Sequence, residues 1–186
     1  MLGCARIICL KKGGTALKEL FSIDLKDYNP NDSVFRRPSA RAIIVKKNII
    51  ALVYSVREKY YKFPGGGIKD EEDMRDALSR EVKEEVGLIV KPESISEFGS
   101  VIRRQKSNYT ENTIFEQENY YFWCECEEKV VDQNLDDYEK EAEFVLRYVD
   151  IDEAIKVNSE YRSDDFFNEI MIRREKKVLE MIKANL

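Results

Sequence analysis

The chain has 186 residues and a net charge of −5, from 31 basic and 36 acidic side chains. This length predicts a single domain, and a composition of 43% hydrophobic and 36% charged residues is typical of a globular protein. The acidic balance argues against a protein that coats nucleic acid, and the absence of histidine excludes Ser-His-Asp catalysis and histidine-based zinc sites.

The first third of the chain predicts several short strands. Residues 1–14 contain too short an apolar run for a signal peptide, and no later stretch is long enough to span a membrane, so we expect a cytoplasmic protein. Strands are expected at 5–10 and 20–25, and a turn at 27–32. The β-branched runs at 40–45 and 49–56 are separated by Lys-Lys-Asn, which indicates a hairpin. We interpret residues 1–40 as an N-terminal extension that adds strands to one domain spanning 1–186.

The rest of the chain is predicted to contain both helices and strands. A helix is expected at 73–86, ended by Gly87 as a left-handed cap. Strands are expected at 95–104, 114–127 and 143–149, followed by a short helix at 150–158 and an amphipathic helix at 164–185. The apolar face expected for that last helix consists of Phe167, Ile170, Met171, Val178, Met181 and Ile182. This order predicts an α+β fold whose mixed sheet is covered by helices on its faces.

The four cysteines give no recognised metal-binding pattern. Cys124 and Cys126 have strand-like spacing and point to the same face. We interpret them, with Cys4 and Cys9, as reduced thiols of a cytosolic protein. A four-thiolate metal site is the weaker alternative.

The predicted helix at 73–86 carries an unusual group of carboxylates. Glu81, Glu84 and Glu85 stand at i, i+3 and i+4, and at about 100° per residue they fill an arc beside the apolar stripe. Lys83 falls on the other side of the helix, so no lysine at i+4 offsets their repulsion. The ordinary interpretation of such a run is a solvated helix face. A hard cation such as Mg²⁺, which prefers oxygen ligands, would relieve the repulsion and gives the alternative.

The spacing of fixed residues around this helix is specific. Gly66 is followed by five residues and Glu72, then by seven residues and Arg80-Glu81, and then by Glu84-Glu85 two residues later. The run from Gly66 to Leu88 resembles the Nudix box, and each fixed position matches. A chance coincidence of seven fixed residues is expected on the order of once in a hundred thousand chains. The preceding strand pair and the Phe-Pro-Gly-Gly sequence also resemble this family.

The resemblance implies a fold, a reaction and a set of ligands. It implies an α/β/α sandwich with a mixed sheet, and a hydrolase that uses Mg²⁺ or Mn²⁺ to direct water at the phosphorus of a nucleoside diphosphate linked to another group. Glu81, Glu84, Glu85 and the carbonyl of Gly66 would be metal ligands. Arg80 would orient these carboxylates, and Glu72 would be its structural partner. Among these, Glu84, Glu81 and Arg80 are the expected catalytic residues.

The general base stays open at this stage. In some members of the family it is a glutamate of the box, which here makes Glu84 a candidate. In others it is a carboxylate on a later loop, which here brings in Glu139, Glu141 and Glu143. Each of these three, taken singly, is more typical of a solvent-exposed side chain.

Substrate-binding residues are harder to predict from sequence. We expect Arg41, Lys62, Phe63 and Glu143 to contact substrate, although strand aromatics are more often core and cations more often plain surface charge. Other candidates are the aromatic residues Tyr54, Tyr61, Tyr120, Phe122 and Trp123 and the cations Arg103 and Arg104. The proline typical of ADP-ribose hydrolases and the tyrosine typical of dinucleoside polyphosphate hydrolases are both absent from 103–105.

The sequence therefore predicts a Mg²⁺-dependent hydrolase of a nucleoside di- or triphosphate derivative. The alternative from another class is a non-catalytic domain of the same fold that binds a nucleotide as a sensor or scaffold. Retention of all the box carboxylates favours the enzyme. An isomerase acting on a diphosphate is disfavoured, since the chain has no histidine and no cysteine near the box. The expected partner is a small molecule, not nucleic acid or a membrane, and a homodimer is left open.

Overall fold

The computed structural model describes residues 17–186, so the strand expected at 5–10 and the thiols of Cys4 and Cys9 lie outside the described residues. The strands are β1 (Glu19–Asp24), β2 (Ser33–Arg36), β3 (Ser39–Ile43), β4 (Val45–Lys46), β5 (Ile49–Ser55), β6 (Tyr60–Lys62), β7 (Gly65–Gly67), β8 (Leu88–Val90), β9 (Ser96–Lys106), β10 (Thr113–Trp123), β11 (Cys126–Val130) and β12 (Phe144–Asp150). The helices are α1 (Met74–Val86), α2 (Asp137–Glu141), α3 (Ile151–Glu160) and α4 (Phe166–Lys183), with a 3-10 turn η1 (Pro92–Ser94).

The central sheet is mixed and is built around the long strand β10. One edge of β10 pairs antiparallel with β9, and β9 in turn pairs parallel with β1. The other edge of β10 pairs parallel with β2 and, further along, with β3. The outer edge of β3 carries β7 in antiparallel register. The segment that precedes β3 therefore supplies β1 and β2 to this sheet.

A second sheet is centred on β5. β12 pairs antiparallel with one edge of β5, and β4 and β6 pair with the other. The β4–β5 turn contains Lys47 and Asn48, where the hairpin is predicted. Only β4 pairs with β5 there, because most of the expected strand at 40–45 is β3 and belongs to the central sheet. β8 and β11 form a separate antiparallel pair.

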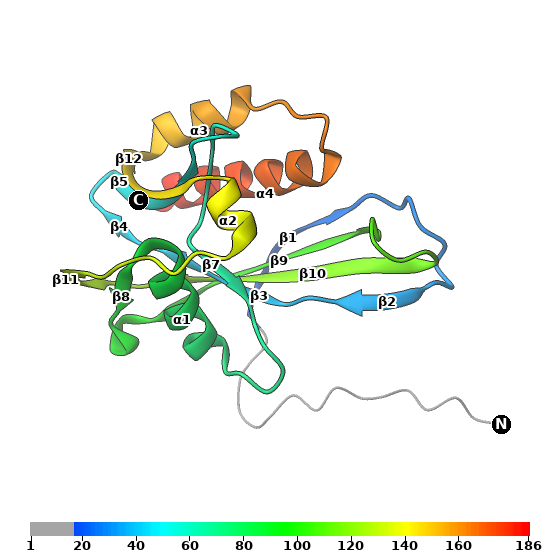
Figure 1. Cartoon of the computed structure of the whole chain (residues 1–186), viewed down its shortest axis with the longest axis horizontal. Helices are drawn as coiled ribbons and strands as arrows, with labels where there is room; N and C mark the ends of the chain where they lie inside the picture. The colour runs from blue at the N-terminus through cyan, green and yellow to red at the C-terminus, as the bar shows by residue number, and fades with distance from the viewer. Residues whose placement is uncertain (1–16) are drawn as a thin grey trace.

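The helices cover both faces of the central sheet, as Figure 1 shows. α1 lies on one side, where Val82 packs in one hydrophobic cluster with Ala42 of β3. α3 and α4 lie on the other side, where Val178 packs in a second cluster with Tyr121 of β10. The expected α/β/α arrangement with a central mixed sheet is confirmed.

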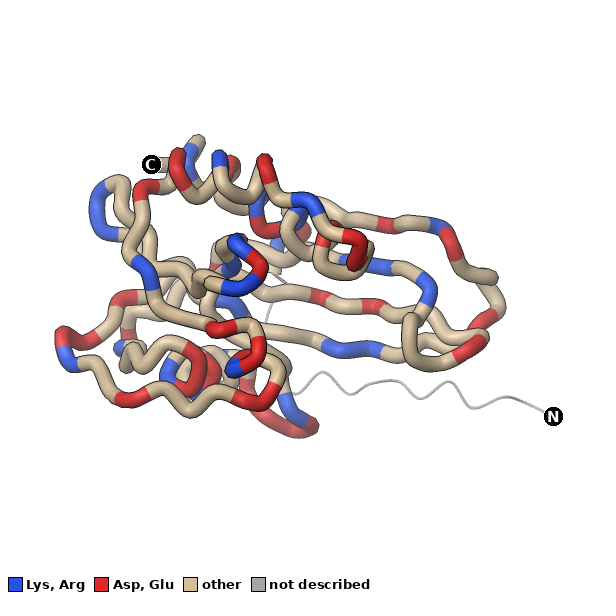
Figure 2. The backbone as a smooth tube through the Cα atoms, turned by 45° about the horizontal axis from the view of Figure 1, so that its top comes forward, with Lys and Arg blue, Asp and Glu red and all other residues tan. Residues whose placement is uncertain are grey.

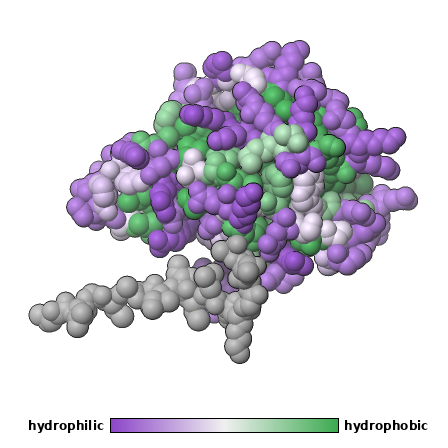
Figure 3. Space-filling model, turned by 180° about the vertical axis from the view of Figure 1, so that it is seen from behind, coloured by the Kyte–Doolittle hydropathy of each residue, from purple (hydrophilic) through white to green (hydrophobic). Residues whose placement is uncertain are grey.

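The surface carries charges of both signs. Figure 2 shows acidic and basic residues distributed along the described trace, and each of the helices α1 to α4 carries both signs. From behind, hydrophobic surface is interrupted by hydrophilic side chains (Figure 3). Across residues 17–186, none of the helices combines the length and the apolar character needed to cross a membrane.

Several short elements differ from the sequence-based expectations. The glycine run at 65–67 forms the strand β7, because its backbone pairs with β3. The strand expected at 114–127 ends at Trp123, and β11 starts separately at Cys126. β2, β8 and α2 have no counterpart among the predictions. Each is five residues or shorter, so local periodicity carries little information about it.

The buried face of α4 is also less apolar than predicted. Ile170, Val178 and Ile182 are buried as expected, but Phe167, Met171 and Met181 are only half-buried. The same helix buries the charged neighbours Arg174 and Glu175, which are 1% and 0% exposed. A pattern that counts only apolar residues misses them, because their burial depends on each other and on polar groups of the sheet.

Candidate active site

Helix α1 is fixed at both ends by residues suited to those positions. The side chain of Asp73 accepts a hydrogen bond from the amide of Arg75 and caps the first turn. Gly87 ends the helix at φ +70°, where its amide donates to the carbonyl of Lys83. The buried residues Leu78 and Val82 attach one side of the helix to the sheet, so the adjacent carboxylate arc is held in a defined orientation.

Arg80 is the hub of the polar side of α1. Its Nε and Nη2 atoms bind the two carboxylate oxygens of Glu72 at 2.7 and 2.8 Å, a bidentate pair. Its Nη1 atom donates to Glu81 at 2.5 Å and to Glu84 at 3.1 Å, and Nη2 also donates to the carbonyl of Gly67 at 3.1 Å. The hydrogen bond with Arg80 lowers the pKa of Glu72 to about 2. The structure thus brings together the arginine and three of the acidic residues that the sequence predicted.

Gly66 and Glu81 lie in direct contact. A Cβ atom placed on Gly66 would stand 2.1 Å from Oε2 of Glu81, closer than any real contact. A side chain at this position would displace the carboxylate of Glu81, so glycine keeps that carboxylate beside β7. The contact places the backbone of β7 beside the carboxylate that the sequence predicted as its fellow ligand.

Glu85 differs from the other carboxylates of α1 in being buried. Its side chain is 1% exposed and forms an ion pair with Lys62, while its Oε2 atom accepts the amide of Gly65 at 2.9 Å. Lys62 also lies over the ring of Phe144, 4.3 Å from the centroid. In the structure, the lysine expected to contact substrate pairs with a carboxylate of α1.

The other expected substrate-binding residues lie at different depths. Arg41 is buried and donates to the carbonyl of Gly65. Phe63 is fully buried, with its ring edge-on to Tyr121. Glu143 is exposed and precedes β12 in a left-handed conformation at φ +52°. Arg41 and Phe63 are therefore closed off from solvent, whereas Glu143 is open to it.

The carboxylates considered as a loop-borne base have distinct surroundings. Glu139 lies in α2, where it forms a reciprocal capping box with Asp136. Burial, together with the nearby carboxylate of Glu85, raises the pKa of Glu139 to about 7. Glu141 is exposed and pairs with Arg57 at 2.8 Å. Glu139 is thus the candidate on the later segment whose carboxyl group is influenced by a carboxylate of α1.

The remaining aromatic candidates are mostly engaged in packing. The ring of Tyr61 lies 4.8 Å from that of Tyr54, and Phe122 is buried. Trp123 packs edge-on against Phe98, 5.4 Å between centroids, and the hydroxyl of Tyr120 donates to Glu118. Each of these side chains therefore has a packing or hydrogen-bond partner within the protein.

Divalent cation binding fits the donor chemistry of α1, with one rearrangement. Within residues 17–186, no three acidic or thiol side chains already converge as a metal cluster. In the same part of the chain, Oε2 of Glu81 and Oε1 of Glu84 have no hydrogen-bond donor. Both are hard oxygen donors of the kind that Mg²⁺ prefers. Binding by both carboxylates would reduce their contacts with Nη1 of Arg80, which stays anchored by Glu72.

Two structural partners of α1 are absent from the sequence-based predictions. The amide of Asn134 donates to the carbonyl of Glu84, and that of Val131 donates to Gly87. On the opposite face of the central sheet, the side chain of Glu175 in α4 accepts a hydrogen bond from the amide of Phe63. No signal in the local sequence indicates these contacts, because each joins residues that are more than 40 positions apart.

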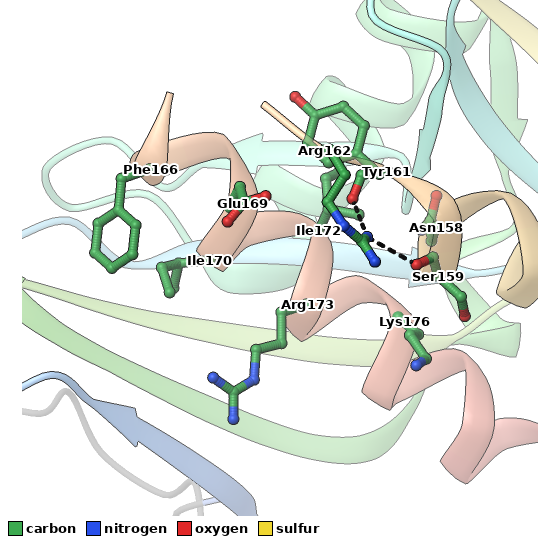
Figure 4. A pocket seen from close by; sticks show the side chains of 10 residues that line it. All are labelled: Asn158, Ser159, Tyr161, Arg162, Phe166, Glu169, Ile170, Ile172, Arg173 and Lys176. Carbon is green, nitrogen blue, oxygen red and sulfur yellow. Dashed lines mark hydrogen bonds between the residues drawn. The ribbon is translucent and has the colours of Figure 1, made fainter. Parts of the chain in front are cut away.

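A separate pocket of about 370 Å³ lies between α3 and α4, on the opposite side of the sheet from α1 (Figure 4). Its lining includes Arg162, Arg173 and Lys176, together with Phe166 and Glu169. The guanidinium of Arg162 is bound to the carbonyls of Ser159 and Tyr161. This pocket contains none of the residues expected to hold a metal.

A match to a family model agrees with the motif. The model of the NUDIX domain matches residues 34–169. An 8-oxo-dGTP diphosphatase of Buchnera aphidicola subsp. Schizaphis graminum (strain Sg) is 44% identical over 50 residues, which is 25% of this chain and only 38% of that relative. Among solved structures, a NUDIX hydrolase from Nitrosomonas europaea is 20% identical with a TM-score of 0.49, over 75% of this chain and 89% of that one. A MutT mutator protein from Bacillus halodurans is 20% identical with a TM-score of 0.48, over 65% and 72%.

Proposed function

The chain belongs to the NUDIX domain family, and from that premise we propose that it is a Mg²⁺-dependent pyrophosphohydrolase. The proposed reaction is attack of water on phosphorus in a nucleoside di- or triphosphate derivative, which releases a nucleoside monophosphate and a second phosphorylated product. The reaction suits a site built from carboxylates, because phosphoryl transfer depends mainly on positioning and charge neutralisation. The reduced state of Cys124 and Cys126 suits a cytoplasmic location.

The arrangement around Arg80 carries the proposal. One guanidinium binds Glu72 with two hydrogen bonds and reaches Glu81 and Glu84 with the third nitrogen. A helix meant only for solvation needs no such anchor, since exposed ion pairs contribute little stability. The arginine fixes the rotamers of two carboxylates that would otherwise repel each other, which pre-organises a cation site.

Glu81 and Glu84 would hold the divalent cation, with Glu85 and the Gly66 carbonyl as further candidates. When bound, the cation would neutralise phosphate charge and lower the pKa of a coordinated water. The chain itself contributes the orientation of the carboxylates that would bind the cation. Arg80 keeps the two carboxylates in place, and Glu72 keeps Arg80 in place. Glu84 is the more exposed of the pair, at 37% against 17%, which makes it the better candidate to accept a proton from water.

The substrate is proposed at the level of a nucleoside di- or triphosphate derivative. The activity after which the Buchnera relative is named, 8-oxo-dGTP diphosphatase, makes 8-oxo-dGTP the first compound to test. The matched segment covers only part of both chains, so the panel also includes unmodified nucleoside triphosphates, nucleoside diphosphate sugars and dinucleoside polyphosphates.

The test is hydrolysis of this panel by the purified full chain with Mg²⁺, Mn²⁺ or EDTA, with products identified by mass. Reaction in ¹⁸O-labelled water shows which product receives the oxygen and hence which phosphorus is attacked. We expect metal-dependent release of a nucleoside monophosphate. Absence of turnover on every compound, together with metal-dependent nucleotide binding, would support the non-catalytic sensor or scaffold instead.

A matched pair of variants on α1 tests the assignment of residues. Glu84→Gln should reduce kcat by at least about 100-fold while the circular dichroism spectrum and the melting temperature stay near those of the wild type. Lys83→Gln is the control, because Lys83 is the exposed neighbour on the other side of the helix. Equal activity in both variants would contradict the role of Glu84.

A further inference from the structure

The sheet face beneath α4 is polar where a hydrophobic core would be expected. Cross-strand pairing puts Arg103 of β9 opposite Gln117 of β10, and Gln105 two residues further along the same face of β9. All three side chains are buried, with exposed fractions of 0%, 9% and 2%. Arg174 of α4 reaches this face and donates to Gln117 at 3.0 Å. The helix therefore covers a layer of buried amide and guanidinium groups.

The charges in this layer do not balance. Arg103, Arg174 and Arg41 are all at least 90% buried, and the buried carboxylate among them is that of Glu175. Glu175 is bound by Arg174 at 2.6 Å and by the hydroxyl of Tyr121 at 3.1 Å. Three formal positive charges thus face one negative charge. Buried ions are normally paired, because an unpaired one loses its hydration without compensation.

Arg103 is the group that lacks a counter-charge. Its Nε atom donates to Gln105 at 2.7 Å and its Nη2 atom to the carbonyl of Phe167 at 3.1 Å, and both of these acceptors are neutral. Its buried Nη1 atom has no hydrogen-bond partner among the described residues. Burial, with the nearby charge of Arg174, lowers the pKa of Arg103 to about 9. Asp27 and Asp165 lie near enough to offset part of this effect, but neither forms an ion pair with it in the described chain.

We propose that Arg103, supported by Arg174, Gln105 and Gln117, forms a binding subsite for a phosphate-type oxyanion beneath the N-terminal turn of α4. A tetrahedral oxyanion would accept the unused N–H of Arg103 and supply the missing negative charge. Guanidinium is suited to this role, since its planar donors match phosphate oxygens in pairs. The neighbouring amide NH₂ groups can donate to further oxygens.

The first turn of α4 closes this subsite. The ring of Phe167 lies over the guanidinium of Arg103, 4.0 Å from its carbon to the ring centroid. The preceding residue, Phe166, is 56% exposed and borders the open pocket of Figure 4. This turn is therefore packed on its inner side and open on its outer side. Outward movement of Phe167 would admit an anion without disturbing the buried remainder of the helix.

The subsite connects to the candidate active site through buried polar contacts. Arg174 binds Glu175, and Glu175 binds the amide of Phe63. Phe63 lies two residues before Gly65, whose carbonyl accepts from Arg41. The bound phosphate can thus belong to the nucleotide, in which case this inference deepens the proposed function, or it can be a free anion that acts on its own.

The test is an anion-dependent thermal shift of the full chain with inorganic phosphate as the probe. Phosphate is compared with chloride at equal ionic strength and with EDTA present, so that neither metal nor turnover is involved. At a phosphate concentration tenfold above its dissociation constant, we expect the wild-type melting temperature to rise by about 3 to 5 °C. The Arg103→Met variant should show no such rise, and in chloride it should melt at the same temperature as the wild type or above it, because the unpaired charge is gone.

Arg104→Met is the matched control. Arg104 is the next residue of β9, but it faces the other side of the sheet and pairs with the half-buried Glu116 at 2.5 Å. This variant should keep the full phosphate shift. An equal phosphate effect on both variants, or no effect on the wild type, would overturn the proposal.

A direct measurement covers the case in which Arg103→Met does not fold. In the ¹⁵N-labelled wild type, phosphate should shift the side-chain N–H resonances of Arg103 and Arg174 and leave those of Arg104 in place. Unchanged resonances of Arg103 at saturating phosphate would refute the subsite. Competition between phosphate and a nucleotide without metal then separates the two sources. Competitive binding assigns the subsite to the nucleotide, and independent binding assigns it to a free anion.

Discussion

At the scale of single residues, Gly66 is the position where the smallest change should have a large effect. In Gly66→Ala, the added methyl group would meet the carboxylate of Glu81 at 2.1 Å, and the carboxylate must move. We expect Mg²⁺ affinity and kcat/KM to fall by about 10- to 100-fold, measured by metal titration and steady-state kinetics.

Gly67→Ala provides the control for this substitution. A Cβ atom at Gly67 would meet only the Nε atom of Arg37, at an ordinary 3.8 Å. This variant should retain the metal affinity and activity of the wild type. A similar loss in both variants would show that β7 tolerates no side chain at all, which would remove the specific link between Gly66 and Glu81.

Glu139 should make stability depend on pH in the opposite sense to most carboxylates. Burial raises its folded-state pKa from 4.5 to about 7, so the folded protein holds this proton more tightly than the unfolded chain does. Glu139 therefore has no effect on the free energy of unfolding below pH 4.5, where both states are protonated. Between pH 4.5 and 7 it lowers this free energy progressively, and above pH 7 the loss stays constant. Glu139→Gln, which keeps the capping acceptor, should raise the free energy of unfolding at pH 8 by about 1 kcal/mol after allowance for solvent screening.

The measurement is urea denaturation of wild type and Glu139→Gln at pH 4.5 and pH 8. The exposed Glu141, two residues away, gives the control substitution Glu141→Gln, whose effect should be small and nearly independent of pH. A stabilisation by Glu139→Gln that is equal at both pH values would contradict the raised pKa.

At the scale of elements, the junction after α1 joins three segments at one residue. Gly87 ends the helix at φ +70°, begins the connection to β8, and accepts the amide of Val131 through its carbonyl. In Gly87→Ala, the methyl group would stand 2.1 Å from the carbonyl oxygen of Val131, in a conformation that is also unfavourable for alanine. We expect a loss of about 2 to 3 kcal/mol in the free energy of unfolding.

Hydrogen exchange separates the two parts of this cost. If the segment after β11 is displaced, the amides of Val131 and Asn134 should exchange faster in Gly87→Ala than in the wild type, while the amides of β10 stay protected. Unchanged protection of both amides would mean that the strain remains within the backbone of residue 87.

The same elements mark how far the sequence could predict the structure. α1 was predicted almost to the residue, because its cap, its apolar stripe and its terminal glycine all agree. The carboxylates of the candidate site are predicted from the spacing of that one helix. β2 and β7 were not found, because their strand conformation comes from pairing with β10 and β3. The ion pair of Lys62 with Glu85 was likewise hidden, since it depends on two elements meeting in space.

At the scale of the whole molecule, α4 connects the central sheet to the strand β6 and the turn that follows it. One carboxylate, that of Glu175, accepts from the amide of Phe63, from Tyr121 on β10, and from Arg174 on the same helix. Glu175→Gln would leave the buried Arg174 without its negative partner. We expect the free energy of unfolding to fall by about 3 to 5 kcal/mol, measured by chemical denaturation.

An exposed pair on the same helix calibrates this effect. Glu180 forms an i,i+4 pair with Lys176 at 3.6 Å, with both side chains at least 36% exposed. Glu180→Gln should change the free energy of unfolding by at most about 0.5 kcal/mol. Comparable losses of unfolding free energy in the two variants would show that the buried network stabilises the packing of α4 on the sheet no more than an exposed ion pair does.

The contacts of Arg80 also allow the charge of the candidate site to be counted. Glu72, Glu81 and Glu84 contribute three formal negative charges, and Arg80 cancels one of them. Glu85 is already neutralised by Lys62. The remainder is −2, which one divalent ion balances. The charge of any further ion would have to be balanced by the phosphates of the substrate. The number of metal ions bound should therefore differ between the free protein and its complex with the nucleotide.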